Sequence, residues 1–214
     1  MTSDVSVLDY GIGNLLSVTR AFAAIGATPR LITSPGEVAS AERLVVPGVG
    51  AYGRCAEVLR ARGLTDAVLS YCRTERPFLG ICVGMQLMMD CSTEFGTHSG
   101  FGLIAGRVDA IPSIGKDGRP HKIPHIGWSR LRRPEGGHEW KGTPLDSIAD
   151  GSYVYFVHSY TAYPDDVAAR LADVDYHGCQ ISAAVCHGSL FGVQFHPEKS
   201  GQVGLQMLSS FVNL

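Results

Sequence analysis

The segment Phe78–Met89, with the sequence FLGICVGMQLMM, carries the pattern that decides the fold. A short apolar run leads into Gly80-Ile81-Cys82-Val83-Gly84, and a helical pattern from Met85 to Met89 follows. In a strand-to-helix elbow of the form glycine-x-nucleophile-x-glycine the nucleophile takes a strained backbone conformation, and larger neighbours would collide. Such a turn presents its nucleophile at the carboxyl end of a strand, the usual site edge of an open α/β sheet. The pattern predicts either a catalytic Cys82 or a buried cysteine between two incidental glycines.

The rest of the first half alternates short apolar runs with helical patterns. We expect strands at Val5–Leu8, Pro29–Ile32, Leu44–Val46 and Phe78–Ile81, and helices at Leu15–Ile25 and Arg54–Tyr71, the second of them broken at Gly63. Strand and helix in alternation predict a parallel sheet with crossover helices.

The second half changes character, because short strands separated by Gly/Pro turns run from Phe101 to Val193. Tyr153–Val157 and Leu190–Val193 are the clearest strands, and Ser200–Phe211 is an amphipathic helix. The polar loops at 112–124 and 132–144 lie between strands that need each other for burial. We therefore expect one α/β domain over residues 1–214, with an open, mostly parallel central sheet, flanking helices and additional short antiparallel strands in the second half.

The charge balance and the cysteine spacing exclude several classes of protein. With 18 Lys and Arg against 20 Asp and Glu, the 214-residue chain has a net charge of −2, which argues against a nucleic-acid groove or a polybasic membrane surface. No apolar run approaches the roughly 18 residues of a spanning helix. The start, Met1-Thr2-Ser3-Asp4, lacks the basic and apolar character of a secretory signal. The six cysteines show neither a Cys-x-x-Cys pair nor zinc-finger spacing. We expect a cytoplasmic protein with no structural metal.

The segment Gly192–Glu198 supplies a possible partner for the cysteine. His196 and Glu198 stand two residues apart, and residues at that spacing face the same side of an extended segment. Pro197 disfavours a helical conformation at His196. Glu198 could then accept from one imidazole nitrogen and leave the other to face a thiol, the logic of nucleophile, base and orienting group. The alternative is a surface turn with an incidental His-Glu pair.

A glycine turn at Val46–Ala51 follows the third predicted strand. Acyl chemistry needs two N–H donors aimed at a developing oxyanion. The Val83 N–H is one natural donor, and the turn around Val49 and Gly50 could supply the other. Glycine turns after strands are also common structural elements, and a phosphate loop is disfavoured because the Lys-Ser/Thr ending is missing. Three such signals, each at a strand's carboxyl end, together favour an active site.

The segments Gly80–Gln86 and Phe195–Glu198 together resemble the class I, or triad, glutamine amidotransferases. More narrowly, five segments are similar to the glutaminase-subunit family of imidazole glycerol phosphate synthases: Asp9–Leu15, Pro47–Ala51, Pro124–Trp128, Tyr155–Tyr160 and His196–Ser200. The resemblance extends from Asp9 to Phe211. One departure is Ser129, where the family usually has Asn.

The resemblance implies hydrolysis of glutamine to glutamate and ammonia. Cys82 would attack the carboxamide carbon to form a thioester, His196 would shuttle protons and Glu198 would orient the imidazole. Val83, Val49 and Gly50 would supply the backbone oxyanion hole. The residues that match the family's glutamine pocket are Gln86, Glu94, His158, Ser159 and Tyr160. The resemblance implies no metal and no organic cofactor.

The resemblance also implies a partner. The family passes its ammonia to a cyclase (βα)8 barrel, which needs about 250 residues, and this chain has no room for one. A heterodimer with a separate cyclase subunit is therefore expected. The positions that match those facing the cyclase are Asn14, Trp128, Tyr155 and Lys199.

Three alternatives remain open from the residues. Another triad amidotransferase is disfavoured by the Asp9–Asn14 and His125–Trp128 motifs. A stand-alone cysteine hydrolase or peptidase would need neither the Tyr10-Gly11 motif nor a docking face. A catalytically silent binding homologue is disfavoured by the intact cysteine, histidine and glutamate.

Overall fold

The computed structural model describes residues 4–214. Residues 1–3, most of the segment considered above for a secretory signal, lie outside the described residues. The helices are α1 (Leu15–Ala24), α2 (Pro35–Ser40), α3 (Tyr52–Ala61), α4 (Leu64–Cys72), α5 (Val83–Gln86) and α6 (Gly201–Val212), with 3-10 turns at Val167–Ala169 and Pro197–Lys199. Within the described residues, no helix has both the length and the hydropathy needed to cross a membrane.

In the described part of the chain, residues 4–214, thirteen strands form three sheets. The central sheet contains β1 (Asp4–Leu8), β2 (Thr28–Ile32), β3 (Leu44–Gly48), β4 (Phe78–Cys82), β11 (Arg170–Tyr176), β12 (Cys179–His187) and β13 (Leu190–Val193). The smaller sheets contain β5 (Cys91–Ser92), β6 (His98–Ser99), β7 (Gly106–Ala110) and β10 (Tyr160–Pro164), and, separately, β8 (His125–Arg130) and β9 (Tyr153–His158).

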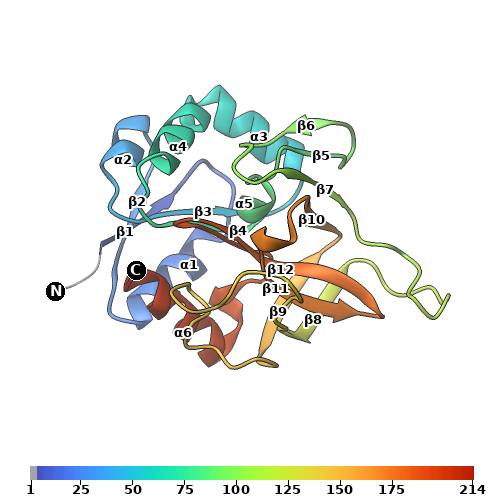
Figure 1. Ribbon diagram of the computed structural model, residues 1–214. Coiled ribbons are helices and arrows are strands. Elements are labelled where there is room, and N and C mark those ends of the chain that lie inside the picture. The colour runs from blue at the N-terminus through green and yellow to red at the C-terminus, as the bar shows by residue number, and fades with distance from the viewer. Residues whose placement is uncertain (1–3) are drawn as a thin grey trace.

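The central sheet has the strand order β11-β12-β13-β4-β3-β1-β2. The strands from β13 to β2 run parallel, and β12 and β11 are added antiparallel at one edge. Helices α2, α3 and α4 cover one face, and α1 and α6 cover the other (Figure 1). The predicted fold class is therefore confirmed, including the short antiparallel strands of the second half.

Burial on both faces explains why the middle strands are continuously apolar. Every residue of β3 and β4 is buried, as expected of parallel strands covered by helices on both sides. On one covering layer, α1 buries Val18, Ala21 and Phe22, and the Phe22 ring lies 6.4 Å from that of Phe211 in α6. These contacts fix the layers that carry the site.

One local prediction needs correction, and one short helix was not predicted. The helix expected at Met85–Met89 instead begins at Val83 and ends at Gln86. It stops because the carbonyls of Leu87 and Met88 accept hydrogen bonds from the chain at 101–104 instead of from a following helical turn. The short helix α2 was not predicted, although its Ser34 cap and Glu37 form a complete capping box.

The other helix limits agree closely with the prediction. The break expected at Gly63 separates α3 from α4, and Gly63 adopts the left-handed conformation with φ +65°. The α3 helix starts at Tyr52, two residues before the predicted start.

The strand register determines where the site forms. In the parallel ladder Gly48 at the end of β3 pairs with Cys82 at the end of β4, and Val193 at the end of β13 pairs with Ile81. Three neighbouring strands thus end at one edge. The loops that follow them carry the glycine turn, the cysteine elbow and the His-Glu segment.

Candidate active site

Cys82 occupies a strained elbow between β4 and α5. Its φ of +55° and ψ of −110° lie outside the regions that non-glycine residues normally adopt. A Cβ on Gly80 would lie 2.5 Å from the Gly84 carbonyl oxygen, and a Cβ on Gly84 would overlap the Val46 carbonyl oxygen. Glycine is therefore needed at both Gly80 and Gly84 because neighbouring backbone atoms leave no room for a Cβ. The elbow brings the Cys82 side chain, 5% exposed, to the wall of a cavity.

His196 and Glu198 form a buried pair. The His196 Nδ1 lies 2.9 Å from the Glu198 Oε1, and the two side chains are 4% and 1% exposed. His196 is extended, with φ −98° and ψ +97°, as predicted, but the extended segment does not continue. Pro197–Lys199 is instead a 3-10 turn that folds the Glu198 carboxylate back onto the imidazole. Ser200 braces the turn by donating from Oγ to the His196 carbonyl at 2.7 Å and accepting from the Tyr155 N–H at 3.0 Å.

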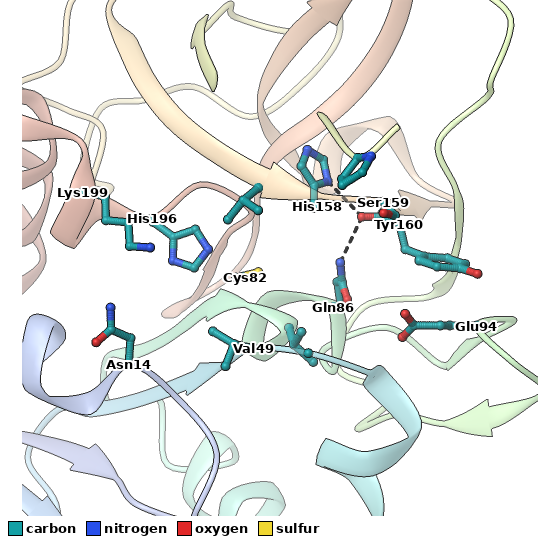
Figure 2. A pocket seen from close by; sticks show the side chains of 14 residues that line it. Asn14, Val49, Cys82, Gln86, Glu94, His158, Ser159, Tyr160, His196 and Lys199 are labelled. Carbon is teal, nitrogen blue, oxygen red and sulfur yellow. Dashed lines mark hydrogen bonds between the residues drawn. The ribbon is translucent and has the colours of Figure 1, made fainter. Parts of the chain in front are cut away.

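The second ring nitrogen of His196 is left free for chemistry. Within the described residues, its Nε2 is buried and has no hydrogen-bond partner. Figure 2 shows the imidazole and the Cys82 sulfur close together on one side of the cavity. Burial lowers the pKa of His196, but the Cys82 sulfur and the Glu198 carboxylate more than offset this effect and raise that pKa to about 9. At neutral pH the arrangement therefore places an imidazolium beside the Cys82 sulfur.

The glycine turn after β3 lies beside the cysteine. Val49, Gly50 and Val83 all line the cavity with Cys82. Gly50 has a φ of +82°, which favours glycine, and a Cβ there would meet no atom within 4 Å, so the backbone conformation and not crowding selects glycine. The Val49 carbonyl accepts from the buried Cys55 thiol at 3.6 Å. The sequence-predicted oxyanion donors are therefore brought together.

The cavity has a volume of about 310 Å³. All five residues expected to hold glutamine line it: Gln86, Glu94, His158, Ser159 and Tyr160 (Figure 2). The Gln86 Nε2 donates to the Tyr160 carbonyl at 3.0 Å. The Glu94 Oε2 accepts from the Tyr52 N–H at 2.6 Å, which fixes the carboxylate at the start of α3.

His158 is committed to the protein through both ring nitrogens. Its Nδ1 lies 2.9 Å from the Tyr160 carbonyl and its Nε2 lies 3.0 Å from the His125 Nδ1. Because a carbonyl only accepts, Nδ1 of His158 carries its proton and Nε2 accepts from His125; the His125 Nε2 in turn accepts from the Ser129 hydroxyl at 2.9 Å. Burial lowers the pKa of His125 to about 4 and that of His158 to about 3. Both rings are therefore neutral, and His158 shapes the cavity wall.

The four residues expected to face a partner divide into two groups. Asn14 and Lys199 line the cavity at its mouth. Trp128 and Tyr155 lie outside it, paired across β8 and β9 with ring centroids 5.9 Å apart. The Lys199 Nζ lies 6.0 Å from the Tyr155 ring centroid and so connects the two groups.

The described residues include no cluster of three or more His, Cys, Asp and Glu side chains arranged to hold a metal ion.

Three residues that contribute to the site were not predicted from the sequence. They are Gln194, which contacts the Cys82 sulfur, Ser200, which braces His196, and His125, which fixes His158. All three lie within segments that the sequence analysis singled out because of other residues in them. Their contacts depend on strands that are distant in sequence.

The comparisons with known proteins agree with this geometry. The family model for glutamine amidotransferase class-I matches residues 6–213. The chain is 50% identical over 212 residues to imidazole glycerol phosphate synthase subunit HisH 1 of Legionella pneumophila strain Lens, covering 99% of this chain and 100% of that protein. It is 42% identical to subunit HisH of Syntrophotalea carbinolica, covering 97% and 98% of the two chains.

Solved structures show the same fold at low sequence identity. PurLQS from Thermotoga maritima superimposes with a TM-score of 0.74 at 19% identity, covering 100% of this chain and 99% of that one. A structure described as a glutamine amidotransferase gives a TM-score of 0.71 at 15% identity, with 98% and 99% covered. With the family model matching nearly the whole chain and the curated relatives matching it from end to end, this protein belongs to the class I glutamine amidotransferases.

Proposed function

We propose that this chain is the glutaminase subunit of an imidazole glycerol phosphate synthase, formed by one domain over residues 1–214 and acting in the cytoplasm. The observation that carries the proposal is the convergence of Cys82, His196 and the Glu94 carboxylate on one cavity, with Glu198 bonded to the Nδ1 of His196. The full-length relatives that are named HisH support the choice of this amidotransferase over others.

The first half of the reaction forms a thioester. The Cys82 thiolate attacks the carboxamide carbon of glutamine, and the carbonyl oxygen becomes an oxyanion held by N–H groups of Val83 and the Val49-Gly50 turn. The His196 imidazolium gives its Nε2 proton to the amide nitrogen, the C–N bond breaks, and ammonia leaves. Glu198 keeps the Nδ1 proton in place during this transfer.

The second half releases glutamate. His196, now neutral, takes a proton from water at Nε2 while the water oxygen attacks the thioester carbon. The C–S bond then breaks, and the departing thiolate again faces an imidazolium. No redox step and no further reactant are needed.

Substrate recognition follows from the charges and donors around the cavity. The Glu94 carboxylate, held by the Tyr52 N–H, suits the α-ammonium group of glutamine. Ser159 and Tyr160 present backbone and side-chain polar groups on the facing wall, and Gln86 lies between that wall and Cys82 (Figure 2). His158 contributes by fixing the Tyr160 carbonyl, since its ring nitrogens are both engaged.

The partner is a cyclase of the (βα)8 class that receives the ammonia. The β8–β9 ribbon turns one face outward, and that face exposes Ile126 (51%), Trp128 (53%) and Tyr153 (46%). Exposed aromatic clusters of this kind suit a protein–protein interface. Asn14 and Lys199 lie at the cavity mouth, where an interface would join the two active sites.

The decisive test measures ammonia and glutamate release from glutamine by this chain alone and with its cyclase. The proposal expects hydrolysis that rises when the cyclase is present, together with incorporation of the nitrogen into the cyclase product. Hydrolysis that ignores the cyclase would favour a stand-alone hydrolase, and no hydrolysis under either condition would favour a silent binding homologue.

A further inference from the structure

Gln194 lies directly after β13 and reaches the catalytic sulfur. Its Nε2 lies 3.6 Å from the Cys82 Sγ, a normal hydrogen-bond length for sulfur, and the residue is fully buried. The backbone N–H of Gln194 donates to the Ala183 carbonyl at 2.8 Å, which holds the residue in place. Because His196 follows two residues later, one segment supplies two groups beside the same sulfur.

The hydrogen-bond network fixes which end of the Gln194 amide faces Cys82. The Gln86 amide nitrogen lies 3.0 Å from the Tyr160 carbonyl and 3.0 Å from the Gln194 Oε1. A carbonyl only accepts, so the nitrogen of Gln86 must face Tyr160 and can give its second proton only to an acceptor. The oxygen of Gln194 therefore faces Gln86. The NH₂ group of Gln194 is left to donate to the sulfur.

We propose that Gln194 is a positioning and thiolate-stabilising residue, oriented by Gln86, that donates a hydrogen bond to the Cys82 sulfur. This inference rests on the proposed function for its catalytic meaning. A hydrogen-bond donor that contacts the charged form of an acid, here the thiolate of Cys82, stabilises that form. It therefore favours the attacking thiolate and also the thiolate that leaves when the thioester is hydrolysed. In the neutral thioester the same bond is weaker, so the stabilisation is greatest at the charged stages.

Within the series of hydrogen bonds Tyr160–Gln86–Gln194–Cys82, the two glutamine side chains have different roles. Gln86 lines the cavity and touches the substrate space, whereas Gln194 lies behind the sulfur and is not part of the cavity wall. Loss of the Gln194 donor should therefore lower kcat and leave KM nearly unchanged. Loss of Gln86 should alter both, because it removes a wall residue and releases the Gln194 amide.

The test measures the rate of Cys82 alkylation by iodoacetamide as a function of pH, with the modified site followed by mass spectrometry. Two variants remove the donor: Gln194→Leu, and Gln194→Glu, which keeps the shape and an acceptor for Gln86. We expect the alkylation midpoint to rise by about one pH unit in the leucine variant, equivalent to an about tenfold smaller thiolate fraction below both midpoints. The glutamate variant should shift further, because its negative charge faces the sulfur.

The control is Gln206→Leu on the exposed side of α6, which should leave the midpoint unchanged. Should the leucine variant fail to fold, the near-isosteric glutamate variant decides the matter. An unchanged midpoint in a folded Gln194 variant would overturn the inference, since a merely structural role predicts lower stability without this shift. A Gln194-dependent midpoint in a chain that hydrolyses no glutamine with its cyclase would instead contradict the proposed function.

Discussion

The Nδ1 of His196 lies 2.9 Å from the Oε1 of Glu198, and both side chains are almost fully buried. With water excluded, the carboxylate holds the imidazole in one orientation and keeps Nε2 free within the cavity. The Cys82 sulfur and the Glu198 carboxylate together raise the pKa of His196 to about 9. The histidine is therefore charged when the enzyme is at rest at neutral pH.

Substitution of the two partners should have unequal effects. His196→Ala should lower kcat by about 10²–10⁴-fold, because it removes the group that transfers protons. Glu198→Gln should cost less, since its amide oxygen can still accept from Nδ1, but it should lower the pKa of His196. We expect the alkaline limb of the kcat profile, which reports loss of the imidazolium near pH 9, to move to lower pH in Glu198→Gln. Wild-type activity in His196→Ala at pH 7 would contradict the triad.

A second prediction concerns which thiol reacts. Cys82→Ala should abolish glutamine hydrolysis while leaving thermal unfolding nearly unchanged, because this small side chain lies at a cavity wall. Cys91→Ala is the matched control, since Cys91 is only half-buried but lies outside the cavity. A chloroketone analogue of glutamine should label Cys82 alone. Labelling at Cys91 or Cys179, detected by peptide mass spectrometry, would exclude the assignment.

The glycine at the elbow gives a prediction about stability. A Cβ on Gly84 would overlap the Val46 backbone oxygen, and backbone on both sides leaves little room for relaxation. Gly84→Ala should therefore lower the free energy of unfolding by about 1–3 kcal/mol or more, measured in urea. Gly36→Ala in α2 is the control, because no atom lies within 4 Å of a Cβ there and alanine favours the helix. Equal stability of the two variants would contradict the crowding argument.

The parts of the fold that could be predicted from the sequence depend on local physics. The close approach of Gly80 to the Gly84 carbonyl and the left-handed Gly63 are encoded within a few residues, and the apolar runs specify the buried parallel strands. The crowding of Gly84 against the Val46 carbonyl also requires β3 to lie beside β4. The Ser34 capping box was also readable, although α2 is too short to show a helical period. The end of α5 could not be predicted from the sequence, because it depends on hydrogen bonds that the Leu87 and Met88 carbonyls accept from residues 101–104.

The active site likewise has features that the sequence predicted and features that it did not. The sequence motif identified His196 and Glu198 but not the 3-10 turn between them, since Pro197 permits both an extended segment and a turn. The hydrogen bond between His158 and His125 depends on the register of β8 against β9, which places these two residues opposite each other. Gln194 reaches Cys82 only because β13 lies beside β4. Such contacts follow from the strand order of the sheet, which no single segment encodes.

The neutral histidines predict acid sensitivity. Burial lowers the pKa of His125 to about 4 and that of His158 to about 3. Below the ordinary value near 6.5 the unfolded chain binds protons that the folded chain does not. The stability from these groups is thus complete above about pH 6.5 and is lost as the pH falls toward 4, at about 1.4 kcal/mol per pH unit for each group. In this window His196 adds no slope, because its raised pKa leaves it protonated in both states.

His125→Phe isolates one of these groups. Phenylalanine keeps the stacking on Phe156 and Tyr176, whose ring centroids lie 4.9 Å and 4.1 Å from that of His125, but it does not titrate. We expect the variant to be less stable at pH 7, because the His158 Nε2 loses its donor, and its stability to depend less steeply on pH by about one proton. Urea unfolding between pH 4.5 and 7 measures both effects. A slope equal to that of the wild type would show that His125 is not neutral in the folded chain.

The last prediction concerns the partner. Trp128 is half-exposed, yet it packs against Tyr155, which in turn faces Lys199 at the cavity mouth. An exposed tryptophan supported in this way is suited to be an interface anchor, and such residues typically cost at least about 2 kcal/mol when truncated, or an about thirtyfold weaker Kd. We expect Trp128→Ala to weaken cyclase binding by that factor in titration calorimetry and to leave thermal unfolding of the isolated chain nearly unchanged. Leu31→Ala is the control, because Leu31 is 49% exposed on β2, the edge strand of the central sheet. Equal loss of affinity in both variants would show that Trp128 is not an anchor of the interface.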